Sequence, residues 1–240
     1  LLGAFSQSGQ SCISVQRVLV QSEVFEDFAA GLVKQVESLK VGDPMDPTVD
    51  VGPVIQKSEV GRIDSWVQEA VSQGATVLTG GKAEEPFYYP TLIADVQPDM
   101  KVCREEIFGP VVTISPYQTF DDAIASVNDS RFGLQAGVFT NDINRAFQAH
   151  RDIEVGGVIV NDVSAFRADQ MPYGGSKDSG FGREGGFEEA VYRSVVGDDP
   201  EWAVEGTLRG HEPLPRLPEL QAPTVTVTTN LLPEAPDGLI

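Results

Sequence analysis

Short runs of β-branched residues alternate with helical patterns over residues 17–196, and this alternation constrains the fold more than any other feature. Such an order is typical of βα units built around a largely parallel sheet. The predicted strands are residues 17–20, 76–78, 91–95, 111–115, 136–139 and 157–161. The sequence therefore predicts an α/β fold, a three-layer domain with a largely parallel sheet flanked by helices.

Three amphipathic segments are predicted as helices. In the first, apolar residues follow Ser22, a candidate N-cap, at helical spacing: Phe25, Phe28, Leu32, Val36 and Leu39. The second stops at Gly74 and has this apolar series: Val60, Ile63, Val67 and Val71. The third follows Thr119, with Asp122 in the position of a capping box, and its series is Phe120, Ile124 and Val127. We expect the last two to pack on the sheet.

The composition changes after Val196, where prolines and acidic residues become frequent and periodicity is lost. We therefore expect a domain over residues 1–196 and a proline-rich, acidic and flexible tail over residues 197–240. Within this tail, Thr224 to Thr229 alternates valine with threonine and could form one edge strand.

A formal net charge of -19 excludes a nucleic-acid or anionic-membrane surface as the favoured partner. No apolar run reaches the roughly 18 to 20 residues that a membrane span needs. The two cysteines, Cys12 and Cys103, are far apart and form no CxxC, so no metal site and no disulfide framework is indicated. These features predict a cytoplasmic protein with reduced thiols.

Cys12 closes the segment Gly9-Gln10-Ser11-Cys12, a small and polar stretch just before a predicted strand. Backbone N–H groups in such a stretch can bind a developing negative charge, which suits a nucleophile. Taken alone, a single cysteine is more often a small buried apolar residue. Both interpretations stay open on this segment by itself.

Two further motifs are Arg-Glu-Glu-Ile-Phe-Gly-Pro-Val at residues 104–111 and Met-Pro-Tyr-Gly-Gly-Ser-Lys-Asp-Ser-Gly-Phe-Gly-Arg-Glu at residues 171–184. Together with the Cys12 segment, they resemble the aldehyde dehydrogenase superfamily from Gly3 to about Val196. Within it, residues 166–173 are similar to the branch that handles small polar or anionic aldehydes, such as lactaldehyde or phosphonoacetaldehyde.

The resemblance implies a mechanism in which Cys12 attacks an aldehyde, hydride passes to NAD or NADP, and the resulting thioester is hydrolysed to a carboxylic acid. It also implies that Glu106 binds the nicotinamide ribose, because its two carboxylate oxygens can accept from both hydroxyls of a diol. Phe108 would pack near the nicotinamide. Outside the motif, Glu106 would be read as part of a solvated turn and Phe108 as a core residue.

Three residues are candidates for the substrate pocket by the same resemblance. Tyr173 matches an aromatic of the substrate tunnel, and Asn161 matches a residue that orders the active site, although an asparagine that ends a strand usually caps a turn. Arg167 could pair with an anionic substrate group, but a surface salt bridge is the commoner role of an arginine.

No segment matches the family's phosphate-binding segment or its catalytic Glu-Leu-Gly-Gly motif, and the chain starts at Leu1. We therefore expect a catalytic part without its cofactor domain, inactive alone, whose full-length form is a homo-oligomer acting on a small-molecule aldehyde. Two alternatives stay open: a non-catalytic scaffold or interaction module derived from a dehydrogenase half, and a family member that transfers the acyl group to coenzyme A.

Overall fold

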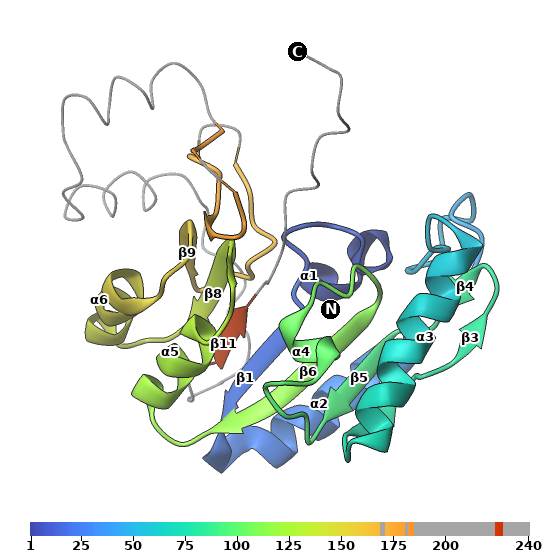
Figure 1. Cartoon of the computed structure of the whole chain (residues 1–240), viewed down its shortest axis with the longest axis horizontal. Coiled ribbons are helices and arrows are strands. Elements are labelled where there is room, and N and C mark those ends of the chain that lie inside the picture. The colour runs from blue at the N-terminus through green and yellow to red at the C-terminus, as the bar shows by residue number, and fades with distance from the viewer. Residues whose placement is uncertain (169–170, 181, 185–223, 228–240) are drawn as a thin grey trace.

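The computed structural model describes residues 1–168, 171–180, 182–184 and 224–227. Its centre is a seven-stranded sheet in the order β2-β5-β6-β1-β11-β8-β9 (Figure 1). The strands are β1 (Arg17–Gln21), β2 (Thr76–Thr79), β5 (Thr91–Ala94), β6 (Val111–Tyr117), β8 (Gln135–Phe139), β9 (Gly157–Val160) and β11 (Thr224–Val227). All six strands expected in the first 196 residues are confirmed.

Five strands of the sheet run in the same direction. β1 pairs in parallel with β6, β6 with β5, and β8 with β9. β11 is antiparallel to both β1 and β8, so these two are parallel to each other, and β2 is antiparallel to β5. The predicted largely parallel sheet is confirmed.

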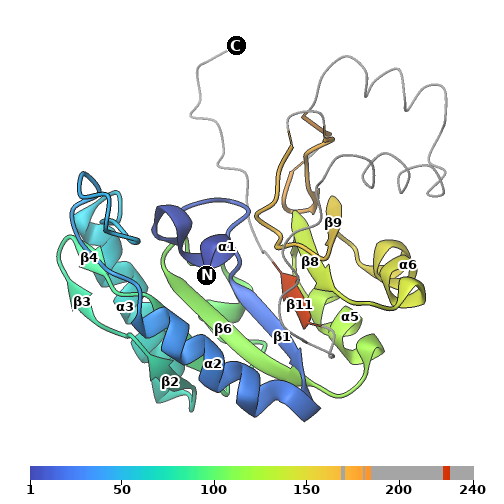
Figure 2. The same ribbon diagram turned by 180° about the vertical axis from the view of Figure 1, so that it is seen from behind.

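Helices cover both faces of this sheet, as Figures 1 and 2 show from opposite sides. One face carries α1 (Leu2–Phe5) and α2 (Phe25–Glu37). The other carries α3 (Lys57–Ser72), α4 (Lys101–Arg104), α5 (Phe120–Asn128) and α6 (Ile143–Asp152). Within the described ranges, every helix is too short or too polar to pass through a lipid bilayer.

The period-2 alternation of the strands divides the core between the two faces. Val18 and Val20 of β1 pack with α2, whereas Leu19 between them packs with α5 and α6. In β5, Leu92 faces α2 and Ile93 faces α3. Because successive side chains of a strand point to opposite faces, a run of apolar residues is what a sheet covered on both sides requires.

The capping box that the sequence predicts for α5 is confirmed. The Thr119 hydroxyl accepts from the Asp122 N–H at 3.2 Å, and the Asp122 carboxylate accepts from the Thr119 N–H at 2.9 Å. The proposed N-cap of α2 is wrong, because Val24 occupies that position. Ser22 lies in a short 3-10 turn, η2 (Ser22–Val24), and its hydroxyl donates to the Tyr117 carbonyl at 2.8 Å.

The strand expected within Thr224 to Thr229 is present as β11, but its expected position at the edge is wrong. β11 pairs on both sides, with β1 and with β8. Neither of those strands pairs directly with the other, and β11 satisfies the backbone groups along both. The remaining residues of the expected tail lie outside the described residues.

Four short strands form two small sheets apart from the main one. β3 (Ala83–Glu84) pairs with β4 (Phe87–Tyr88), and β7 (Phe132–Gly133) pairs with β10 (Ser176–Lys177). The β7–β10 pair matters for function because β10 lies within the motif of residues 171–184. It connects that motif to the start of β8.

Candidate active site

Cys12 lies in the loop between η1 (Ser6–Gly9) and β1, and it is half-buried. The turn before it is left-handed at three successive residues, with φ of 52° at Gln7, 58° at Ser8 and 70° at Gly9. Left-handed backbone disfavours ordinary side chains, so contacts from elsewhere must hold this turn. The Ser8 hydroxyl provides one, donating to the Gly52 carbonyl at 2.8 Å.

The motif with Glu106 and Phe108 forms the loop between α4 and β6, which packs against the Cys12 loop. Glu106 is half-buried, while Phe108 has a φ of 45° and is 39% exposed. An exposed aromatic in a left-handed conformation does not fit the interpretation of Phe108 as a core residue. Ser11, from the Cys12 loop, lines one small cavity together with Glu106 and Phe108.

Gln16 fixes the two loops relative to each other. Its buried side-chain amide donates to the carbonyls of Val102 and Glu105 at 3.0 and 2.7 Å, and its Oε1 accepts from the Ile107 N–H at 3.0 Å. Sequence reasoning missed this residue. The available signal was a glutamine directly before the apolar strand β1, where a buried amide needs partners.

Arg62 holds the same loop from α3. Its guanidinium donates to the Ile107 carbonyl at 2.6 Å, pairs with Glu59 at 2.7 Å and stacks over Trp66. The side chain therefore braces the Glu106 loop instead of lying free on a helix surface.

Tyr173 lies against Cys12, 161 residues away in the sequence. The tyrosine hydroxyl and the Cys12 Sγ are 2.9 Å apart, within hydrogen-bond distance. Burial, the contact with Cys12 and the charge of Glu184 raise the pKa of Tyr173 above its usual range, and Arg167 opposes that rise. The hydroxyl therefore stays protonated at neutral pH.

Arg167 packs over the ring of Tyr173. Its guanidinium lies 4.1 Å from the centre of the Tyr173 ring, and its nitrogen is 3.9 Å from a Glu184 carboxylate oxygen. The structure thus brings Cys12, Tyr173 and Arg167 into one group. It also supplies Glu184, which the sequence analysis had not assigned to the site.

Asn161 belongs to a different local structure. It is exposed, has a φ of 60°, and its side-chain oxygen accepts from the Thr140 N–H at 2.8 Å. Its own N–H donates to the Val138 carbonyl. These contacts connect the ends of β8 and β9, which is the turn-capping role, and none of them reaches Cys12, Tyr173 or Arg167.

The loop after Tyr173 is held by close backbone approaches and polar contacts. A Cβ at Gly174 would lie 2.5 Å from the Gly182 carbonyl oxygen, and Gly180 and Gly182 have φ of 118° and 75°. These approaches and backbone angles require glycine at the three positions. Gly180, Gly182 and Gly185 have GxGxxG spacing, but they follow the two-residue β10, not a strand of the parallel sheet, so a Rossmann turn is not indicated.

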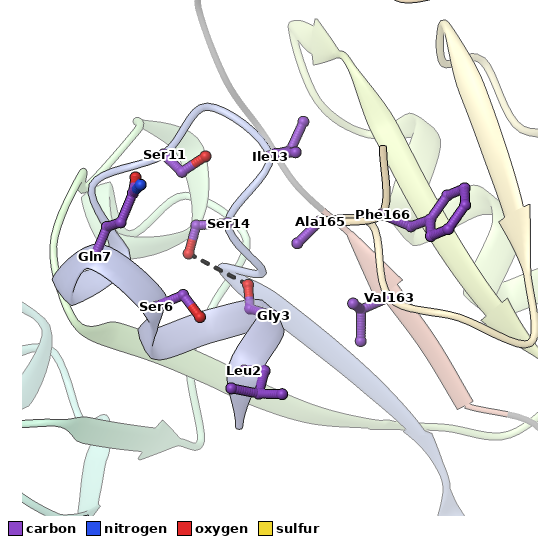
Figure 3. A pocket seen from close by; sticks show the side chains of 10 residues that line it. All are labelled: Leu2, Gly3, Ser6, Gln7, Ser11, Ile13, Ser14, Val163, Ala165 and Phe166. Carbon is purple, nitrogen blue, oxygen red and sulfur yellow. Dashed lines mark hydrogen bonds between the residues drawn. The ribbon is translucent and has the colours of Figure 1, made fainter. Parts of the chain in front are cut away.

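A cavity of about 330 Å³ lies between the first helical turns, the loop before β1 and the segment after β9 (Figure 3). Ser11 and Ile13, the two neighbours of Cys12, line it. The other lining residues come from the first helical turns, from Ser14 and from the segment after β9: Leu2, Gly3, Ser6, Gln7, Val163, Ala165 and Phe166. The last segment directly precedes Arg167 in the sequence.

Among the described residues, Cys103 and His150 lie outside this site. Cys103 is buried in α4, and desolvation raises its pKa, an effect that Arg17 opposes. His150 lies on α6, and His211 is outside the described residues. Across the part of the chain that the structure describes, no group of three or more histidine, cysteine or acidic side chains could hold a metal ion.

Comparison with known proteins identifies the family. The model of the aldehyde dehydrogenase family matches residues 1–195. The 3-sulfolactaldehyde dehydrogenase of Priestia megaterium is 52% identical over 196 residues, which cover 80% of this chain and 41% of that protein. The chain therefore spans less than half of the length of this relative, whose substrate name agrees with the expected lactaldehyde-like branch.

Solved structures give the same result for the fold. Aldehyde dehydrogenase 21 of Physcomitrella patens, in complex with succinate, superimposes with a TM-score of 0.76 at 46% identity, over 77% of this chain and 38% of that one. Glyceraldehyde-3-phosphate dehydrogenase of Methanocaldococcus jannaschii, in complex with NADP, superimposes with a TM-score of 0.74 at 38% identity, over 77% of this chain and 40% of that one. The chain belongs to the aldehyde dehydrogenase family.

Proposed function

We propose that this chain carries the nucleophile and part of the cofactor and substrate sites of an NAD(P)-dependent aldehyde dehydrogenase. The observation that carries the proposal is the position of Cys12, half-buried between Ser11 and Ile13, both of which line the 330 Å³ cavity. An aldehyde in that cavity would lie beside the loop that carries Cys12, because Ser11 and Ile13 of this loop line the cavity. A cysteine placed in this way is suited to attack a carbonyl carbon.

In this mechanism the Cys12 thiolate adds to the aldehyde and forms a thiohemiacetal. The backbone N–H of Cys12 is the donor that this chain offers to the oxyanion. Loss of hydride converts the adduct to a thioester on Cys12, and water then releases the carboxylic acid and restores the thiol. The nicotinamide cofactor, when bound, supplies the hydride acceptor.

Glu106 and Phe108 fit the nicotinamide side of the cofactor. The half-buried carboxylate can accept from both hydroxyls of a ribose, and the exposed aromatic beside it offers a flat apolar surface. Gln16 and Arg62 hold the loop that carries both residues. Glu106 and Phe108 would therefore already be in place before the cofactor binds.

We further propose that the aldehyde carries an anionic group, with Arg167 as its partner. The guanidinium lies over the Tyr173 ring, and the hydroxyl of that ring contacts Cys12. One short molecule could therefore place its anionic group at Arg167 and its carbonyl at Cys12. The Arg167 nitrogen is 3.9 Å from the Glu184 carboxylate oxygen, which is longer than a hydrogen bond. A carboxylate, sulfonate or phosphate could bond the guanidinium in two places at about 2.8 Å.

The relatives support this choice of substrate, because 3-sulfolactaldehyde and glyceraldehyde 3-phosphate are anionic aldehydes and succinate is the acid of another. The test has two arms. The 240-residue chain alone should oxidise no aldehyde with NAD or NADP. A chimera in which residues 1–195 replace the matching segment of the Priestia enzyme should oxidise anionic aldehydes, and Cys12→Ala should abolish that activity.

Arg167→Met in the chimera should raise KM for an anionic aldehyde at least tenfold and leave a neutral aldehyde of similar size unaffected. Arg151→Met is the matched control, since that arginine pairs with the exposed Asp152 on α6. Equal losses for charged and neutral aldehydes would contradict the anion-binding role. Activity that persists in Cys12→Ala would contradict the nucleophile.

A further inference from the structure

The contact between Tyr173 and Cys12 involves the one atom of the site that must react. Other polar contacts of the loop before β1, such as Ser8 with Gly52 and Ser14 with Ala4, are made to backbone carbonyls and shape the loop. The Tyr173 hydroxyl instead lies 2.9 Å from the Cys12 sulfur itself. The contact is therefore made directly to the reacting atom.

The phenol is the donor in this pair once the cysteine ionises. A phenolic O–H is a much better donor than a thiol S–H, and a thiolate is a much better acceptor than a thiol. Only 5% of Tyr173 is exposed, and the raised pKa of its phenol keeps the proton on oxygen. The hydrogen bond is therefore stronger to the charged form of Cys12 than to the neutral form.

The ring that carries this hydroxyl is held from two sides. The Tyr173 N–H donates to the Glu184 carbonyl at 2.8 Å, and the Glu184 N–H donates to the Tyr173 carbonyl at 2.5 Å, which fixes the backbone. The Arg167 guanidinium covers the ring face at 4.1 Å. These contacts hold the backbone of Tyr173 and cover one face of its ring on the side of Arg167.

We propose that Tyr173 is a positioning residue for the nucleophile, whose hydroxyl donates a hydrogen bond to Cys12 Sγ, stabilises the thiolate and fixes the orientation of the sulfur. The proposal adds to the proposed function a role that the tunnel-aromatic assignment of Tyr173 does not contain, and it rests on Cys12 being the nucleophile.

Two charged groups act on the phenol besides the sulfur. Arg167 over the ring favours negative charge at the tyrosine, whereas Glu184 opposes it. Glu106, on the neighbouring loop, lines a small cavity together with Ser11. A test must therefore change the hydroxyl and leave these three charged groups in place.

The pH profile of Cys12 alkylation measures the effect directly in the 240-residue chain, without turnover. Iodoacetamide is reacted at a series of pH values, and peptide mass mapping follows Cys12 and Cys103 separately. Tyr173→Phe removes only the hydroxyl and keeps the ring. The midpoint pH of Cys12 alkylation should rise by about one unit, a tenfold change in thiolate population that corresponds to ~1.4 kcal/mol.

The rate at the high-pH plateau should not fall, because a thiolate freed of its donor is at least as nucleophilic. Tyr89→Phe is the matched control, since the Tyr89 hydroxyl bonds Lys82 and Glu84 instead of a thiol. It should leave the midpoint unchanged. An unchanged midpoint in Tyr173→Phe, or an equal shift in Tyr89→Phe, overturns the proposal.

A second arm of the test keeps the tyrosine ring and changes the strength of its hydroxyl as a hydrogen-bond donor. Replacing the tyrosines biosynthetically with 3-fluorotyrosine makes the phenol a stronger donor, so the Cys12 midpoint should fall, and this effect should vanish in the Tyr173→Phe background. A fall that persists without Tyr173 contradicts the bond. Failure of the proposed function would appear separately, as an active Cys12→Ala chimera, with these alkylation profiles unaffected.

Discussion

Gly9 and Gly109 meet face to face, where the Cys12 loop crosses the loop that carries Glu106. A Cβ built on Gly9 would lie 2.1 Å from the Gly109 carbonyl oxygen, a distance that no side chain can occupy. Gly9 also has a φ of 70°, where a Cβ is disfavoured even in open space. The approach of the nucleophile loop to the cofactor loop therefore depends on the absence of a side chain.

Gly9→Ala should lower the free energy of unfolding by at least ~2 kcal/mol, from backbone strain and displacement of the Gly109 carbonyl. Urea unfolding followed by circular dichroism measures it. Gly61→Ala is the matched control, because nothing lies within 4 Å of a Cβ at that position in α3. It should stabilise the protein by about 0.5–1 kcal/mol, as an alanine replacing a glycine in a helix does. Similar effects of the two variants would contradict this account of Gly9.

Gln16→Met should destabilise the protein by about 2–4 kcal/mol, because a side chain of similar size leaves the buried Ile107 N–H and the carbonyls of Val102 and Glu105 without this partner. The comparison is with Gln118→Met. That glutamine is exposed and, within the described part of the chain, its side chain bonds the Ser22 hydroxyl, so its replacement should cost less than ~0.5 kcal/mol. Equal urea midpoints for the two variants would remove Gln16 as the link between the loops.

The capping box of α5 predicts a pH-dependent contribution to stability. Hydrogen bonds with Thr119 lower the pKa of the Asp122 carboxyl from its model-compound value of 3.8. A carboxyl whose folded pKa is lowered stabilises the fold above the unfolded pKa, and this stabilisation is lost as pH falls through the folded value. Asp122→Asn should therefore cost stability at neutral pH and progressively less below about pH 4.

Asp27→Asn is the control for this measurement. Asp27 takes the corresponding position in α2, where Val24 offers no side-chain cap. The unfolding free energies of both variants are compared with the parent from neutral to acidic pH. A cost of Asp122→Asn that does not diminish in acid, or one no larger than that of Asp27→Asn, would show that the box adds nothing.

Cys12 should be alkylated at least tenfold faster than Cys103 at neutral pH. Cys103 is only 6% exposed, and burial raises its pKa, so both access and thiolate population are low. Limiting iodoacetamide followed by peptide mass mapping gives the two rates. Label that accumulates first on Cys103 would show that Cys12 is not in an open position.

Glu106→Gln in the active chimera should slow hydride transfer, because the amide keeps one acceptor but turns a donor toward a ribose hydroxyl. Single-turnover kinetics at saturating cofactor measures the step. Glu105→Gln is the control, since the Glu105 carboxylate pairs with Arg131 on the outer side of the loop. If Glu106→Gln keeps the parental hydride-transfer rate and cofactor affinity, Glu106 is not a cofactor ligand.

The sequence by itself determined the elements whose stability is local or periodic. The six strands, the buried Val60, Ile63 and Val67 of α3 and the capping box of α5 were predictable, because period-2 and helical spacing and a Thr119–Asp122 pair three residues apart are set by neighbouring residues. Val71, expected on the same face of α3, is instead exposed, and Ala70 is buried. Local patterns also suggested Ser22 as a cap, but the Tyr117 carbonyl from β6 competes for its hydroxyl. A partner so distant in the sequence cannot be recognised from the residues around Ser22.

Only the tertiary structure decided which of the motif residues meet. Cys12 and Tyr173 are brought together across 161 positions by the crossing of three loops, whereas Asn161 remains at the end of β9. The role of Gln16 and the interior position of β11 also depended on the tertiary structure, because the backbone groups that each of them bonds come from segments distant in the sequence. Side-chain chemistry can be read along a chain, but contact between residues far apart depends on how strands and loops pack, and that is a property of the whole fold.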